Sequence, residues 1–137
     1  MWSFVRRVFA AFSFCLALPP LSAAELGDAE LAKFQSPDLL HVPYRAVVTP
    51  GRHDHELLPL IVFLHGDWQD GTDNESQLAG RGNGSYELVD AAREDSIPLV
   101  YIAPQTTDAY WSPDRVVSVV RDALTPWPID PHRIILP

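Results

Sequence analysis

Four stretches of the chain have the hydrophobic pattern of β-strands. Residues 41–49 alternate weakly between two sets of side chains and are rich in β-branched residues. Residues 57–64 are almost wholly apolar, which is typical of a strand buried on both faces, as in a parallel sheet covered by helices. Two shorter apolar runs, 99–103 and 133–136, predict two further strands.

Two stretches between these strands carry helix signals. Residues 85–93 place three apolar side chains on one face, with Ser85 as a candidate cap. The run Ser112-Pro113-Asp114 supplies a cap, a proline at the first helical position and an acid in the first turn, so a second helix should begin there. One face of that helix would carry Val116, Val120, Ala123 and Leu124, although the valines also favour a strand. Strands separated by helices need crossover connections, which predicts an α/β fold with a mostly parallel sheet.

The first 24 residues have the pattern of an export signal. Arg6 and Arg7 precede an apolar run over residues 8–18, and Ser22-Ala23-Ala24 suits cleavage before Glu25. The apolar run is well short of the roughly 20 residues that span a bilayer, so we expect no stable membrane insertion after cleavage. The sequence therefore predicts an exported protein, periplasmic or secreted. Residues 25–40 are polar and mixed, which indicates a surface arm.

Composition and charge narrow the class of partner. The chain has 137 residues, of which 47% are hydrophobic, and its formal net charge is -8. Its 18 acidic residues outnumber its 10 basic ones, whereas proteins that bind nucleic acid concentrate positive charge. We therefore expect a globular domain that does not bind nucleic acid.

A candidate functional loop follows the most apolar strand. His65, Gly66 and Asp67 come directly after residues 57–64, and ligands of open α/β sheets bind beyond the carboxyl ends of the strands. Glycine allows a sharp turn, after which the backbone N–H of Asp67 could face a developing negative charge on an acyl oxygen. The alternative is that His65 and Gly66 only shape a tight turn.

Several segments in order along the chain resemble one group of proteins. They are Tyr44-Arg45, the stretch from Pro59 to Gly66, the stretch from Gly71 to Leu78, Ala103-Pro104-Gln105, and the stretch from Asp130 to Ile134. Together they resemble the start of secreted α/β-hydrolases known as predicted peptidases, dienelactone-hydrolase-like proteins or phospholipase/carboxylesterase-like esterases. The resemblance implies acyl hydrolysis by a serine, with a histidine, an acid and an oxyanion hole. Residue by residue, only the oxyanion hole carries over, to Gly66 and Asp67.

The catalytic residues of that group have no counterpart here. The nucleophile lies in a Gly-x-Ser-x-Gly turn after the strand that begins at Arg133, and no serine of this chain has glycines at both of those positions. Residues 41–137 are thus expected to be the amino-terminal part of an incomplete α/β-hydrolase domain, truncated before the nucleophile and inactive alone. The complete parent would act on a small ester or peptide substrate. The alternative is a small secreted binding protein derived from this fold.

Other side chains are assigned supporting roles. His65, Trp68 and Trp111 are candidates to line a cleft, with packing as the alternative, whereas Trp127 is expected to pack in the core. Asp73 and Asn74 are expected to fix the glycine-containing loop through bonds to its backbone. His53 and His55 lie in a charged turn without the spacing of metal ligands, so we predict no metal site and no cofactor.

Overall fold

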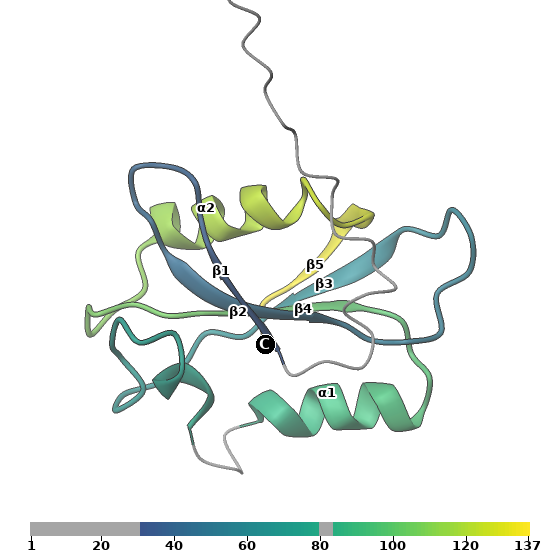
Figure 1. Cartoon of the computed structure of the whole chain (residues 1–137), viewed down its shortest axis with the longest axis horizontal. Helices are drawn as coiled ribbons and strands as arrows, with labels where there is room; N and C mark the ends of the chain where they lie inside the picture. The colour runs from purple at the N-terminus through teal and green to yellow at the C-terminus, as the bar shows by residue number, and fades with distance from the viewer. Residues whose placement is uncertain (1–30, 80–83) are drawn as a thin grey trace, which may run out of the picture.

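A single five-stranded sheet organises the protein. The computed structural model describes residues 31–79 and 84–137 (Figure 1), so the predicted signal sequence lies outside the described residues. The strands are β1 (Ala32–Gln35), β2 (Pro43–Val48), β3 (Leu58–Val62), β4 (Val100–Pro104) and β5 (Ile129–Ile135), in the spatial order β1-β2-β4-β3-β5. The fully apolar strands β3 and β4 lie inside the sheet, as their sequences predict.

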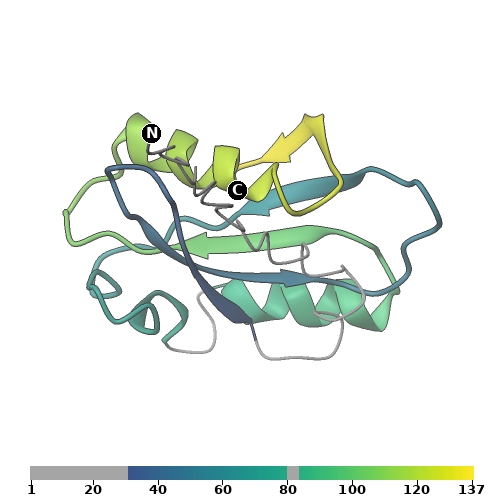
Figure 2. The same cartoon turned by 45° about the horizontal axis from the view of Figure 1, so that its top comes forward.

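Helices cover both faces of the sheet. α1 (Ser85–Glu94) connects β3 to β4, α2 (Pro113–Ala123) connects β4 to β5, and the two helices lie on opposite sides (Figures 1 and 2). A short 3-10 helix, η1 (Ser76–Leu78), precedes α1. The predicted α/β class and the crossover helices are confirmed.

The sheet is mixed rather than mostly parallel. β3 pairs in parallel with β4 and β5, whereas β2 pairs antiparallel with both β1 and β4. The link over residues 49–57 carries no helix, and a parallel return needs a crossover of about a dozen residues or more, so β3 runs against β2. Only the strands joined through α1 and α2 are therefore parallel.

The arm expected over residues 25–40 is partly a strand. In its described part, β1 pairs with β2, and Phe34 stacks on Tyr44 with 5.3 Å between ring centroids. The neighbouring Leu31 and Ser36 are buried, and the Ser36 hydroxyl accepts a hydrogen bond from the N–H of Val42 at 2.9 Å. The interpretation as a surface arm is wrong for this segment, because it forms an edge strand of the sheet. A strand of four residues is too short for its alternation to be recognised in the sequence.

The core lies in two layers, one on each side of the sheet. Alternate residues of β3 belong to opposite layers. Leu58, Leu60 and Val62 lie in the layer on the α2 side, and Ile61 packs into the layer on the α1 side. α2 contributes Val119 and Ala123. Trp127 is buried in the same layer, in agreement with its expected packing role.

The start of α2 follows its sequence signals. Ser112 caps the helix, because its hydroxyl accepts a hydrogen bond from the N–H of Arg115 at 3.3 Å, and Pro113 is the first helical residue. α1 begins at Ser85 as predicted, but its cap is Gly84 in a left-handed conformation rather than Ser85. The start of α2 is therefore set by local sequence signals, whereas α1 begins without a side-chain cap.

Candidate functional site

The carboxyl ends of β3 and β4 bring two loops together. Because the strands are parallel, His65 after β3 and Thr106 after β4 emerge at the same edge of the sheet. The backbone N–H of Thr106 donates to His65 Nε2 at 3.1 Å. This edge is where the sequence placed the candidate loop.

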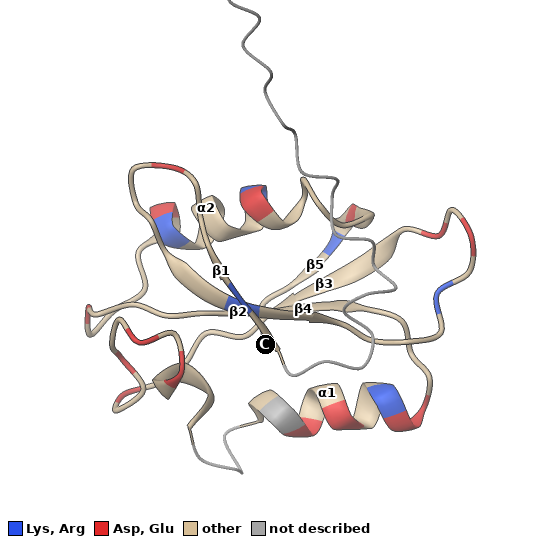
Figure 3. Cartoon of the chain, in the orientation of Figure 1, with Lys and Arg blue, Asp and Glu red and all other residues tan. Residues whose placement is uncertain are grey.

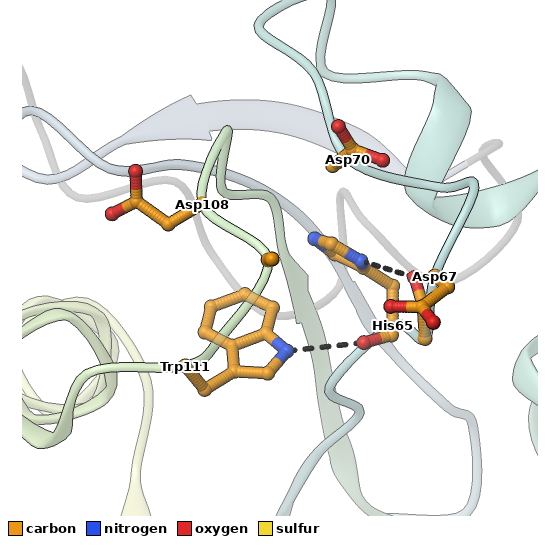
Figure 4. Close-up of a pocket in the computed structure, with 7 residues that line it drawn as sticks. His65, Asp67, Asp70, Asp108 and Trp111 are labelled. Atoms are coloured by element: carbon orange, nitrogen blue, oxygen red, sulfur yellow. Dashed lines mark hydrogen bonds between the residues drawn. The ribbon is translucent and has the colours of Figure 1, made fainter.

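His65 is held on several sides (Figure 4). Its Nδ1 donates to the carbonyl oxygen of Gly66 at 2.9 Å, while Nε2 accepts from Thr106, so the neutral tautomer with hydrogen on Nδ1 satisfies both bonds. Trp111 Nε1 donates to the carbonyl oxygen of His65 at 3.0 Å, and the two rings meet edge to face with 4.9 Å between centroids. Buried and bonded at both nitrogens, His65 joins the two loops rather than offering a free base.

The backbone amides of Gly66 and Asp67 differ in their bonding. The N–H of Gly66 donates to Gln69 Oε1 at 3.3 Å. Among the described residues, the N–H of Asp67 has no hydrogen-bond acceptor. Of the two residues predicted for an oxyanion hole, Asp67 is therefore the one whose N–H is open to a ligand.

A small pocket lies beside this loop. Its volume is about 60 Å³, and its walls include His65, Gly66, Asp67, Asp70, Asp108 and Trp111. Figure 4 shows Asp108 and Trp111 coming from the loop after β4, and His65 and Asp67 from the loop after β3. Sites for drug-sized ligands have volumes of roughly 300 to 1,000 Å³, so this pocket has room for only a small group.

Trp68 stands apart from the other predicted cleft residues. Its side chain is 94% exposed and its φ is 72°, a left-handed conformation that is uncommon for a bulky residue. It borders a second, more open hollow that it shares with Asp67, Asp70 and Thr107. His65 and Trp111 thus line the inner pocket, and Trp68 lies outside it.

Arg115 braces the loop after β4, a role that the sequence did not indicate. It donates to the hydroxyl of Thr106 at 2.8 Å and pairs with Asp108 at 2.9 Å. Arg115 lies in the first turn of α2, so these contacts tie the loop that carries Trp111 to that helix. The position of Thr106, two residues after the apolar strand β4, is the only sequence signal for this pair.

Asp73 shapes the loop before η1. Its Oδ1 accepts from the N–H groups of Glu75 and Ser76, each at 2.9 Å, and from Gln105 Nε2 at 2.8 Å, and its Oδ2 accepts from the Ser76 hydroxyl. The bonds from the Ser76 hydroxyl, the Ser76 N–H and Gln105 hold the pKa of the Asp73 carboxyl well below its usual value. This carboxylate fixes the backbone of its own loop, and Asp73 is not among the residues that line the small pocket or the more open hollow.

Asn74 and Gln105 join the same loop to the sheet. Asn74 is buried, and its Nδ2 donates to the carbonyl oxygens of Phe34 at 3.2 Å and Tyr44 at 3.0 Å. The buried Gln105 side chain accepts from the N–H of Asn74 at 2.6 Å. Gly71 fits this arrangement because a Cβ there would lie 2.9 Å from Gln105 Nε2. Sequence reasoning used Gln105 only as a landmark and missed this role.

The described part of the chain holds neither a cluster of metal ligands nor a membrane-spanning helix. In residues 31–79 and 84–137, no three histidine, cysteine or acidic side chains gather closely enough to hold a metal ion. None of the helices found in this part of the chain has the length and apolar character needed to cross a bilayer. The basic side chains there are spread over separate elements (Figure 3).

Comparison with known proteins identifies the type of fold. The sequence matches no protein family model and no curated protein. A solved structure of a thermostable esterase resembles it with a TM-score of 0.66 and 27% identity, covering 77% of this chain and 33% of that one. The chain thus spans about a third of the length of that esterase. The described residues have an esterase-like α/β-hydrolase fold.

Proposed function

We propose that this chain is the amino-terminal part of an exported, periplasmic or secreted serine hydrolase that cleaves small esters. The observation that carries the proposal is the open N–H of Asp67, in the loop after β3, within a fold that resembles an esterase. Export is inferred from the sequence of residues 1–24. We propose esters rather than peptides as substrates because the similar structure is that of an esterase.

The chemistry assigned to Asp67 is electrostatic. When a serine attacks an ester carbonyl, the carbonyl oxygen becomes negatively charged, and a backbone N–H that already points at it stabilises that charge. One such donor contributes roughly 3 to 4 kcal/mol in the transition state. The tetrahedral intermediate then releases the alcohol, and water hydrolyses the acyl-enzyme to the acid. In this proposal Asp67 supplies one N–H, and no side chain of this chain forms the acyl-enzyme.

Nucleophile, base and orienting acid are assigned to residues encoded beyond Pro137. The sequence has no Gly-x-Ser-x-Gly motif, and the imidazole of His65 is engaged with Thr106 and Gly66. The inner pocket also has room for no more than a small group. This is expected if other residues of the complete polypeptide form the rest of the substrate site. Without a nucleophile, the 137 residues should not hydrolyse esters by themselves.

The test is ester hydrolysis by the polypeptide of the complete reading frame. We expect it to release p-nitrophenol from p-nitrophenyl butyrate, and a serine-directed phosphonate to abolish that release. The 137-residue chain serves as the matched control and should not exceed the background rate. An inactive but folded complete polypeptide would contradict the proposal, as would activity in the short chain that one point substitution abolishes.

The coding sequence past the codon for Pro137 gives an independent check. We expect it to encode Gly-x-Ser-x-Gly soon after β5, either in frame or in a shifted frame. Unrelated sequence in all frames would favour an independent short protein, such as the secreted binding protein considered above.

A further inference from the structure

The side-chain amide of Gln69 makes hydrogen bonds within the protein through both its oxygen and its nitrogen. Its Oε1 accepts from the N–H of Gly66 at 3.3 Å. Its Nε2 donates to the carbonyl oxygens of Gln77 at 3.2 Å and Ala79 at 3.0 Å. These two carbonyls lie at the end of η1, so Gln69 connects the loop after β3 to that helix.

The far end of this connection is itself fixed to the sheet. Gln77 is buried, and its Nε2 donates to the carbonyl oxygen of Ala103 in β4 at 3.2 Å. Gln105 Nε2 also lies 3.5 Å from the carbonyl oxygen of Gln69. Gln69 is therefore attached to a segment that the central strand holds in place.

His65 holds the other side of the same loop. Its Nδ1 donates to the carbonyl oxygen of Gly66 at 2.9 Å. In a trans peptide unit the N–H points opposite to the preceding carbonyl, so the N–H of Asp67 points away from the His65 ring. Both polar groups of Gly66 are thus bonded within the protein, and the orientation of the peptide unit between Gly66 and Asp67 depends on the bond to His65 together with the bond to Gln69.

We propose that Gln69 is a positioning residue for the loop after β3, which carries the N–H of Asp67. By binding the N–H of Gly66, it leaves the N–H of Asp67 as the donor that meets the carbonyl oxygen of the substrate. The catalytic role of the Asp67 N–H rests on the proposed function. Its orientation by Gln69 depends only on the structure of the loop after β3. Glutamine suits the position because one amide supplies an acceptor for Gly66 and two hydrogens for Gln77 and Ala79.

The direction of the Asp67 N–H can be measured in the 137-residue chain. Residual dipolar couplings and relaxation of backbone amides report the direction and order of each N–H bond. We expect Gln69→Met, which keeps the length of the side chain but removes its amide, to change the coupling of Asp67 and lower its order parameter. Gln35→Met is the matched control, because Gln35 also donates its amide to a backbone carbonyl, that of His41, but outside this loop.

A second variant covers the case in which Gln69→Met does not fold. Gln69→Glu has nearly the shape of glutamine and can still accept from Gly66, but it cannot donate to Gln77 and Ala79 at neutral pH. It should also change the Asp67 coupling. An unchanged coupling and order parameter at Asp67 in the folded variants would overturn the proposal.

Kinetics of the complete polypeptide supply the functional readout. Loss of one oxyanion donor lowers kcat by about 100- to 1,000-fold, and a misdirected donor should lower it by about 10- to 100-fold with KM little changed. Unchanged kcat in Gln69→Met would overturn the positioning role. If the unsubstituted polypeptide hydrolyses no ester, the proposed function fails instead, and the dipolar couplings still decide whether Gln69 holds the loop.

Discussion

At the scale of single residues, Asp73 shows how one carboxylate can set a loop. It accepts hydrogen bonds from two backbone N–H groups and two side chains, and all four favour its charged form. The pKa of Asp73 in the folded protein therefore lies below its value in the unfolded chain. The value in the unfolded chain is near 3.9. A lowered pKa stabilises the folded state above the unfolded pKa, and that stabilisation is lost as the pH falls toward the folded value.

Substituting Asp73→Asn should thus destabilise the protein in a pH-dependent way. The difference in unfolding free energy between the original protein and the variant should be constant above about pH 5 and shrink below about pH 4, where Asp73 becomes protonated in the unfolded chain but stays ionised in the folded protein. Urea unfolding at a series of pH values measures this difference. A difference that stays constant down to pH 2 would show that the charge of Asp73 is irrelevant to stability.

Residue roles were predictable where the partners are close in sequence. Asp73 bonds to residues two and three positions away, and such local turns follow from residue type. The bonds of Gln105 to Asn74 and of Thr106 to His65 join residues 31 and 41 positions apart, so they depend on how the strands align. No pattern near Gln69 or Gln105 in the sequence specifies those distant partners.

At the scale of elements, α2 is held to the sheet by one narrow face. Val119 is buried in the core on that side, while Val117, two residues earlier on the same helix, is 43% exposed. Burial of apolar groups gives about 0.8 kcal/mol per methylene, and the empty space left after truncation adds to the cost. The two valines therefore form a matched pair.

We expect Val119→Ala to lower the unfolding free energy by about 2 kcal/mol, because it removes two buried carbon atoms and leaves a cavity. Val117→Ala should change it by no more than about 0.5 kcal/mol. Urea midpoints of the two variants provide the comparison. Equal effects would mean that α2 does not pack on the sheet through Val119.

Elements with strong local signals were the ones that the sequence predicted well. Ser112 and Pro113 start α2, and the uninterrupted apolar runs of β3 and β4 mark the interior of the sheet. β1 was missed because it is short and owes its place to pairing with β2. β5 was expected to begin at Arg133 but begins at Ile129, and its register shifts on passing the Asp130-Pro131 pair.

At the scale of the whole molecule, β5 forms one edge of the sheet. Ile135, its last residue, is 49% exposed. An exposed apolar edge strand is a template for pairing with another chain, and a lysine on the edge opposes such pairing. We therefore expect the 137-residue chain to self-associate through this edge.

Ile135→Lys should reduce that association. Light scattering over a range of protein concentrations should show a smaller mass for the variant than for the original chain. Leu39→Lys is the control, since Leu39 is equally apolar and 97% exposed but lies in the connection between β1 and β2. An equal effect of both substitutions would point to net charge, rather than the β5 edge, as the cause.

The arrangement of the whole sheet also explains which part of the site was predictable. His65, Gly66 and Asp67 could be placed at the carboxyl edge because a buried strand precedes them, and Trp111 meets His65 there only because β3 and β4 are parallel neighbours. The choice between the two backbone amides could not be predicted, since it depends on the side chain of Gln69.

A pair of substitutions at Asp67, made in the polypeptide of the complete reading frame, tests whether its N–H stabilises an oxyanion. Asp67→Pro removes the N–H, whereas Asp67→Asn keeps it and removes only the charge. With p-nitrophenyl butyrate, kcat should fall about 100- to 1,000-fold in Asp67→Pro and stay within about threefold in Asp67→Asn. Equal kcat values in the two variants would show that the N–H of Asp67 does not stabilise the oxyanion.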